Sequence, residues 1–141
     1  MNFHFGPLAI PEEVAECSRR FQQVENEVRE YMRPALKGIE ASNWERVHSY
    51  LLDILIEGNE IANRTELYRE IGRMSAVEAR RLSHKIENHI EDILVVQSIL
   101  EERSGSEDHL RILKRAYRES VELLSALKLL RNPKLEICSG C

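Results

Sequence analysis

The chain has 141 residues, the size of a single domain, and its 20 Lys and Arg against 24 Asp and Glu give a net charge of −4. It is 43% hydrophobic and 31% charged with only 6 Gly and 4 Pro, so it can bury a core and has few residues that interrupt helices. The mildly acidic balance argues against general nucleic-acid binding, which requires a basic surface. Composition therefore favours one helical domain with no nucleic-acid partner.

The sequence also bears on location. No N-terminal stretch joins a basic start to an apolar run, so we expect no signal peptide. The longest charge-free runs, near residues 93–96, are far too short to span a membrane. The cysteines Cys17, Cys138 and Cys141 are odd in number and lack the spacing of a disulfide framework. We expect a cytoplasmic protein without membrane contact.

The N-terminal half predicts an extended arm over residues 1–10 and a pair of helices over residues 11–63. Pro11, Glu12 and Glu13 are typical of a helix start, and Pro34 should kink or end that helix. Its apolar residues follow a heptad seam: Val14, Cys17, Phe21, Val24, Val28, Tyr31 and Ala35.

A capping box at Ser42 and Glu45 predicts the second helix, which Gly58 should weaken. One side of that helix is apolar, with Trp44, Val47, Leu51, Ile54, Leu55, Ile61 and Ala62. Residues 63–74 then read as a short helix or a connecting turn.

The C-terminal half predicts a helical hairpin over residues 66–131. Ser75 and Glu78 form another capping box, so a long helix begins there; the alternative is one helix over residues 66–103 that tolerates Gly72. A turn at Gly105 follows, and Asn132 and Pro133 end the last helix before a tail over residues 132–141. The two helices carry apolar stripes at helical spacing: Leu82, Ile86, Ile90, Ile93, Leu94, Ile99 and Leu100, then Leu110, Leu113, Tyr117, Val121, Leu124, Leu127 and Leu130.

These elements together predict an all-α antiparallel bundle of four to five helices. No segment alternates with period two strongly enough to predict a strand. The hairpin cannot bury both sides of its stripes alone. Either a second copy of the chain or the first two helices could cover them, and the sequence does not choose.

Two histidines on the predicted helix after Ser75 should have different surroundings. At about 100° per residue, His84 falls opposite Leu82, Ile86 and Ile93. It should therefore face water and partners. His89 falls at the edge of the apolar stripe and should be partly buried and paired.

The segment RMSAVEARRLSHKIENHIEDI, residues 73–93, resembles the H-box of sensor histidine kinases, in their dimerisation and histidine-phosphotransfer region. The residues that carry the resemblance are Arg73, Met74, Ser75, Ala76, Leu82, Ser83, His84, Asn88 and Ile90. The following hairpin extends the likeness over residues 66–131, just under half of the chain.

The chain departs from that family in ways that restrict its activity. Lys85 stands where one large branch has an acidic residue, and His89 stands where that branch often has proline; another branch has a basic residue after the histidine. No glycine-rich ATP lid is present. The resemblance therefore implies a phosphotransfer module that cannot phosphorylate itself from ATP, and it leaves open whether the protein is an enzyme.

The resemblance implies that His84 carries a phosphoryl group exchanged with a response-regulator receiver domain. Histidine combines nucleophilicity with a change of charge near neutral pH. Asn88 would support the chemistry, and Arg80 or Lys85 would offset phosphate charge. We expect a homodimer with no cofactor. The alternative function is a non-catalytic helical-bundle protein that binds itself or a partner helix through its seams, with His84 as an ordinary solvated residue.

Three further patterns have ordinary explanations. Glu45 and His48 lie on one face at a spacing that metal bundles use, but those bundles need the pair twice, so we predict no metal site. Cys138 and Cys141 have C-x-x-C spacing without a second ligand pair, which favours a frayed tail. A basic stripe on the last helix, Arg111, Lys114, Arg115 and Arg118, is interspersed with glutamates and favours a mixed solvent face.

Overall fold

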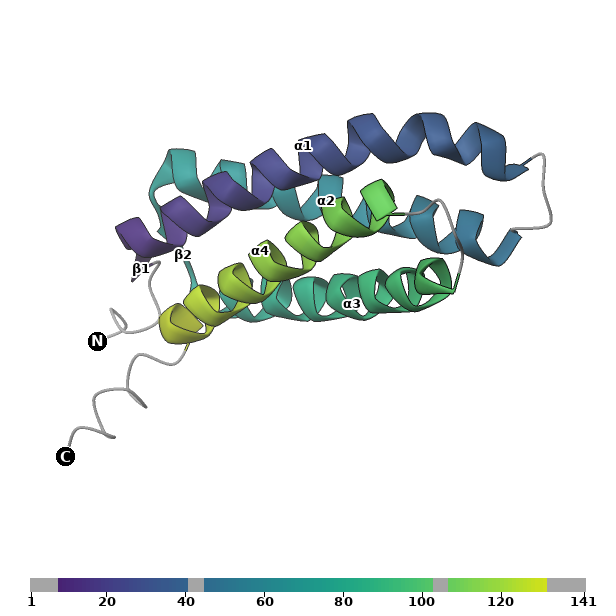
Figure 1. Ribbon diagram of the computed structural model, residues 1–141. Coiled ribbons are helices and arrows are strands. Elements are labelled where there is room, and N and C mark those ends of the chain that lie inside the picture. Colours follow the sequence, from purple (N-terminus) through teal and green to yellow (C-terminus); the bar gives the residue numbers. More distant parts are fainter. Residues whose placement is uncertain (1–7, 41–44, 103–106, 132–141) are drawn as a thin grey trace.

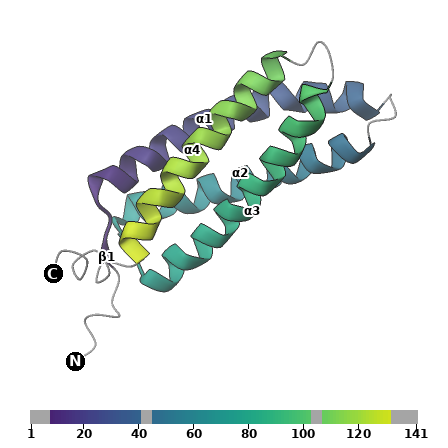
Figure 2. The same ribbon diagram turned by 60° about the horizontal axis from the view of Figure 1, so that its bottom comes forward.

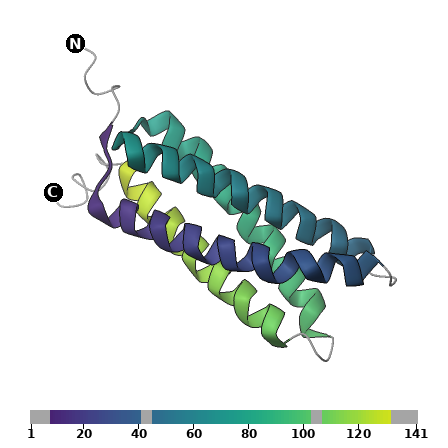
Figure 3. The same cartoon turned by 90° about the horizontal axis from the view of Figure 1, so that it is seen from above.

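The computed structural model describes residues 8–40, 45–102 and 107–131 and forms a four-helix bundle (Figure 1). Its helices are α1 (Glu12–Glu40), α2 (Glu45–Ile71), α3 (Ala76–Glu101) and α4 (Glu107–Arg131). Each helix packs against the next in chain order, and α4 returns to pack against α1. The helices lie lengthwise beside one another in all three views (Figures 1, 2 and 3). The predicted all-α bundle is confirmed.

Helix α1 begins where the sequence predicts and buries most of the predicted seam. Val14, Cys17, Phe21, Val24 and Val28 are buried. Pro34 was predicted to kink or end the helix, and the second of these outcomes is wrong, because α1 continues through this residue to Glu40. Tyr31 was also placed wrongly: it is exposed, and Met32 is buried instead. A strict heptad drifts around a straight helix, so the inward position shifts by one residue after about four turns.

The junction between α2 and α3 is fixed by Gly72 and Ser75. Gly72 has φ +78°, a left-handed conformation that favours glycine, and its amide donates to the carbonyl of Tyr68 at 2.8 Å. Ser75 then caps α3: its hydroxyl accepts from the amide of Glu78, whose carboxylate accepts from the amide of Ser75. The predicted capping box is confirmed. The alternative of one helix from residue 66 is wrong, and the hairpin begins at Ala76.

A short strand pair ties the N-terminal arm to this junction. Strand β1 (Leu8–Ala9) pairs antiparallel with β2 (Arg73–Met74), Leu8 opposite Met74. The amide of Ile10 donates to the carbonyl of Gly72 at 3.0 Å. The expectation of no strand is therefore wrong, because two-residue strands are too short to show alternation.

The stripes of the hairpin are covered by α1 and α2 of the same chain. Two apolar clusters fill the bundle, one on each side of its middle, and all four helices contribute to both. Of the two ways to bury the hairpin, the structure shows the intramolecular one. The predicted stripes are mostly buried or half-buried, but Leu94 is exposed. Buried residues that the prediction missed include Met74, Ala79, Val96, Ala116, Leu123 and Ala126.

Polar residues and a glycine separate the two apolar clusters. Glu25 of α1, His89 of α3 and Ser120 of α4 are buried at this level, and Gly58 of α2 faces Glu25. A Cβ atom at position 58 would overlap Oε2 of Glu25. Gly58, which the sequence suggested only as a weak point of the helix, thus makes room for a buried carboxylate.

We predict that Gly58→Ala destabilises the fold. Alanine favours a helix by about 1 kcal/mol over glycine, but the new methyl group must displace an enclosed carboxylate that His89 holds. Overpacking of this kind costs about 1–3 kcal/mol, so the free energy of unfolding should fall. Urea denaturation followed by circular dichroism measures this, and Asn63→Ala on the exposed face of α2 is the control. A Gly58→Ala protein as stable as the wild type would contradict the packing.

Candidate functional site

His84 is displayed on the outer face of α3. Its side chain is 69% exposed, which confirms that it faces water. The helix beneath it is fixed at its start by the Ser75 capping box and along its inner face by Leu82, Ile86 and Ile93, which are buried. The imidazole therefore stands at a defined place on a rigid surface that a partner can reach.

Four side chains on neighbouring turns surround His84. Arg80 and Arg81 lie one turn before it, and Glu87 and Asn88 lie one turn after it. Nδ1 of His84 lies 3.8 Å from Oε1 of Glu87. Arg80, Arg81 and Asn88 are exposed. The helix thus brings together three of the four residues singled out from the sequence, namely His84, Asn88 and Arg80.

The fourth residue, Lys85, points toward α2. Its ammonium group forms an ion pair with the carboxylate of Glu60. Lys85 follows His84 directly, so its side chain leaves the helix about 100° away. Arg81, which the sequence analysis did not select, is closer to the face of His84.

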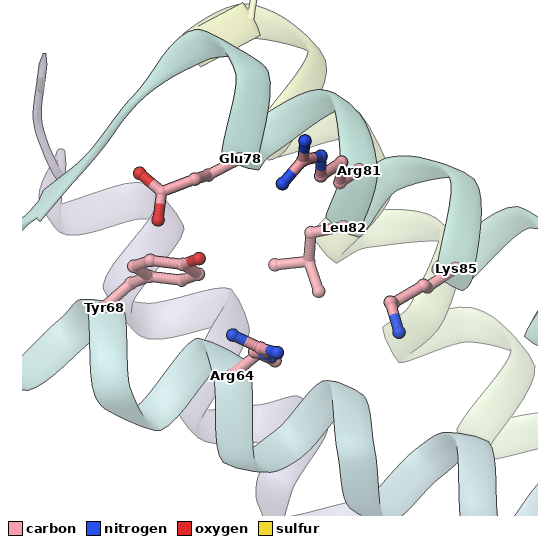
Figure 4. Close-up of a pocket in the computed structure, with 6 residues that line it drawn as sticks. All are labelled: Arg64, Tyr68, Glu78, Arg81, Leu82 and Lys85. Atoms are coloured by element: carbon pink, nitrogen blue, oxygen red, sulfur yellow. The ribbon is translucent and has the colours of Figure 1, made fainter. Parts of the chain in front are cut away.

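Arg81 and Lys85 also line a pocket of about 190 Å³ between α2 and α3. Figure 4 shows Arg64 and Tyr68 of α2 facing Glu78, Arg81 and Leu82 of α3 across this space. Hydrogen bonding with Tyr68 and Ser75 lowers the pKa of Glu78, so this carboxylate is already engaged. The remaining charges, Arg64, Arg81 and Lys85, make this side of the His84 face basic.

His89 is enclosed in the middle of the bundle, with 0% of its side chain exposed. Its Nε2 lies 2.8 Å from Oε1 of Glu25, and its Nδ1 lies 3.2 Å from Oε1 of Glu57. A neutral imidazole carries one N–H, whereas both nitrogens here face carboxylates. His89 is therefore the cation that joins α1, α2 and α3, and it is more deeply buried than expected.

The surroundings shift the pKa values of this cluster. Burial alone would lower the pKa of His89, but hydrogen bonds with Glu25 and Glu57 outweigh it and raise the pKa to about 9. Burial would raise the pKa of Glu57, but His89 and Asp92 lower it. Burial and the neighbouring Glu57 raise the pKa of Asp92 to about 7. The cluster therefore holds charges that depend on pH.

The partners of His89 were not among the predicted site residues, although the sequence contains two signals of them. Glu25 falls one turn after Phe21, on the buried face of α1, where a carboxylate needs a partner. Gly58 interrupts a helix with no other breaker near it. A histidine at the edge of an apolar stripe, a glutamate on the buried face of α1 and a glycine inside α2 together indicate a buried ion pair where the helices approach each other closely.

Within the described residues, the remaining motifs show only ordinary surface ion pairs and core packing. Arg111 and Arg115 of the basic stripe are exposed and pair with Asp108 and Glu27, in keeping with a mixed solvent face. Cys17 is a buried free cysteine of the core. The side chains of Glu45 and His48 and the tail with Cys138 and Cys141 lie outside the described side chains.

Within the part of the chain that the structure describes, no group of three or more His, Cys, Asp or Glu could hold a metal ion. None of its helices has the length and apolar character needed to cross a membrane. Comparison with known proteins finds no matching family, no matching curated protein and no matching solved structure.

We predict that the stability conferred by His89 is lost at alkaline pH. A pKa raised from its ordinary 6.5 to about 9 gives stability that is fully present below 6.5 and disappears as pH rises through about 9. The pKa of Asp92 is raised to about 7, so the stability that this group confers is also lost as pH rises, but at lower pH. The loss between pH 7 and 9 therefore belongs to His89. The free energy of unfolding should fall there by at most about 1.4 kcal/mol per pH unit.

Urea denaturation at a series of pH values measures this fall. The control is the double variant Glu25→Gln, His89→Gln, which keeps polar groups in contact without a titrating pair. It should show a much flatter profile between pH 7 and 9. Equal slopes in the two proteins would disprove the assignment of the charge to His89.

Proposed function

We propose that the protein is a histidine-phosphotransfer module, in which His84 exchanges a phosphoryl group with an aspartate of a response-regulator receiver domain. The observation that carries the proposal is a freely accessible imidazole on a rigid helix. In-line attack on phosphorus needs a nucleophile that a second protein can approach, and a helix face supplies it without a cleft.

We infer that the two ring nitrogens of His84 have different tasks. Nδ1 lies on the side of Glu87, 3.8 Å from its Oε1, so in this proposal the ring keeps its proton on Nδ1 and attacks through the lone pair on Nε2. In the transfer, Nε2 forms a bond to phosphorus while the bond from phosphorus to the aspartyl oxygen breaks. The aspartate leaves as a carboxylate with the bonding electron pair, and the reverse step restores the neutral imidazole.

The charges around His84 suit a negatively charged donor. Arg80 and Arg81 are exposed one turn before the imidazole, so they can approach the oxygens of a phosphoryl group. Asn88, exposed one turn after it, can donate or accept a hydrogen bond at the same group. The ammonium group of Lys85 already pairs with Glu60, so Lys85 does not contact the phosphoryl group directly. It contributes only through its positive charge at the edge of the pocket.

A second candidate function is a helical interaction protein without chemistry at His84. The observation that favours it is a set of large apolar side chains exposed along α2, including Leu52, Ile56 and Ile71. In that case a change at His84 would be silent, whereas changes on α2 would abolish binding. The two functions can be tested separately because they use different helices.

We predict that phosphoramidate, a histidine-directed phosphoryl donor, modifies His84. Mass spectrometry kept at neutral to alkaline pH should locate an acid-labile phosphate on this residue and not on His89, which is enclosed. His84→Gln should lose the modification with a stability change within about 0.5 kcal/mol, because the site is exposed. The same mapping on protein isolated from its native cells tests whether the state occurs there.

The matched control is His109→Gln, since His109 lies near the surface of α4 against the ring of Tyr31. This variant should accept the phosphoryl group on His84 as the wild type does. Asn88→Ala and Arg80→Ala should slow the reaction without preventing it. Phosphorylation that persists in His84→Gln, or spreads equally over the accessible histidines, would exclude a dedicated site.

A further inference from the structure

The outer face of α2 carries most of the exposed large hydrophobic residues of the described surface. Seven such residues are exposed on the described surface, and four of them belong to α2: Leu52, Ile56, Leu67 and Ile71. At about 100° per residue these four fall within about 100° of one another on the helix surface. They form two apolar pairs at the ends of one helix face about 28 Å long, with the exposed Glu60 and Asn63 between them, and we call this face the α2 stripe.

The α2 stripe is symmetric along the helix. Leu52 and Ile71 lie at equal distances from the midpoint between Ile61 and Ala62, and Ile56 and Leu67 do so as well. A helix with this spacing is complementary to itself when a second copy lies antiparallel. Ile56 then meets Leu67 of the other copy near the centre of the face, and Leu52 comes level with Ile71 along the helix, as a two-fold interface requires.

We propose that the α2 stripe binds a second copy of this chain, with the two α2 helices antiparallel about a two-fold axis near Ile61 and Ala62. Helix α2 packs on α1 and α3, so its remaining side is open to a partner. This dimer differs from one that shares the core of the hairpin, because that core is already filled.

Charges beside the α2 stripe select the antiparallel orientation. Glu60 and Arg64 are exposed one turn apart on the same flank of the helix, on either side of the midpoint. The two-fold axis brings Glu60 of each copy level with Asn63 of the other, about 1.5 Å along the helix from Arg64, so each Glu60 can form an ion pair with the other copy's Arg64. A parallel arrangement would oppose Glu60 with Glu60 and Arg64 with Arg64, which is repulsive.

A groove between α1 and α2 provides space for the partner's side chains. It has a volume of about 470 Å³, and its lining includes Arg29, Leu52, Leu55, Ile56 and Asn59. In the antiparallel dimer this half of α2 faces residues 60–71 of the other copy. Leu67 and Ile71 of that copy would therefore enter the groove, and the same contact would occur twice.

Sedimentation equilibrium of the full chain tests the dimer. The mass should rise with concentration from 16.4 kDa toward twice that value. Ile56→Glu and Leu67→Glu should each weaken dimerisation by roughly a hundredfold, because a charge would enter an apolar contact in both copies. The control is Leu94→Glu, an equally exposed apolar position on α3, which should leave dimerisation unchanged. Circular dichroism verifies that each variant is folded.

Charge exchange tests the orientation. Glu60→Arg and Arg64→Glu should each raise the dissociation constant of the dimer by roughly tenfold, and the double variant should restore it. A wild type that stays monomeric at its highest soluble concentration, or a dimer unaffected by Ile56→Glu, would overturn the proposal. A double variant as weak as the single ones would overturn the antiparallel alignment. None of these results depends on phosphorylation of His84.

Discussion

The contact between His89 and Glu25 sets the register of the bundle. The apolar clusters on either side of it consist of aliphatic residues that could pack in more than one alignment. Sliding α1 by one turn would replace the carboxylate beside His89 with Phe21 or Arg29, and Nε2 of the buried imidazole would lose its carboxylate partner. A buried ion pair adds little net stability, but it penalises the wrong register heavily. Gly58 is part of this constraint because only a residue without a side chain admits the carboxylate.

The same contact determines which face of α3 meets the solvent. His84 and His89 are five residues apart, so their side chains leave the helix about 140° from each other. Any rotation of α3 that exposed His89 would turn His84 toward the core. The buried histidine thus orients the accessible one, although the two are not in contact. This arrangement gives the exposed imidazole a fixed position, which transfer to a second protein needs.

Periodicity and capping signals predicted the fold class, the start of α3 and the opposite surroundings of the two histidines. These features depend on short stretches of sequence, such as Ser75 with Glu78, and are therefore local. The end of α2 was harder to place, because the left-handed turn at Gly72 is visible only as a glycine that a helix could also contain. The partners of His89 lie 64 and 32 residues away in the chain, so no local pattern identifies them. Lys85 shows the same limit: its neighbour in sequence is His84, but its ion-pair partner is Glu60 on another helix.

Glu60 connects the two surfaces proposed for function. It holds Lys85 at the edge of the basic pocket, and in the antiparallel dimer it would also meet Arg64 of the other copy. A carboxylate shared between two cations binds each of them less tightly than it would bind one alone. Dimerisation would therefore loosen the hold of Glu60 on Lys85, but it would also bring a carboxylate of the other copy to Arg64, which lines the same pocket. By linkage, an anion bound at Lys85 would favour the dimer and an anion bound at Arg64 would oppose it, so the assembly state and the phosphotransfer face are coupled through Glu60.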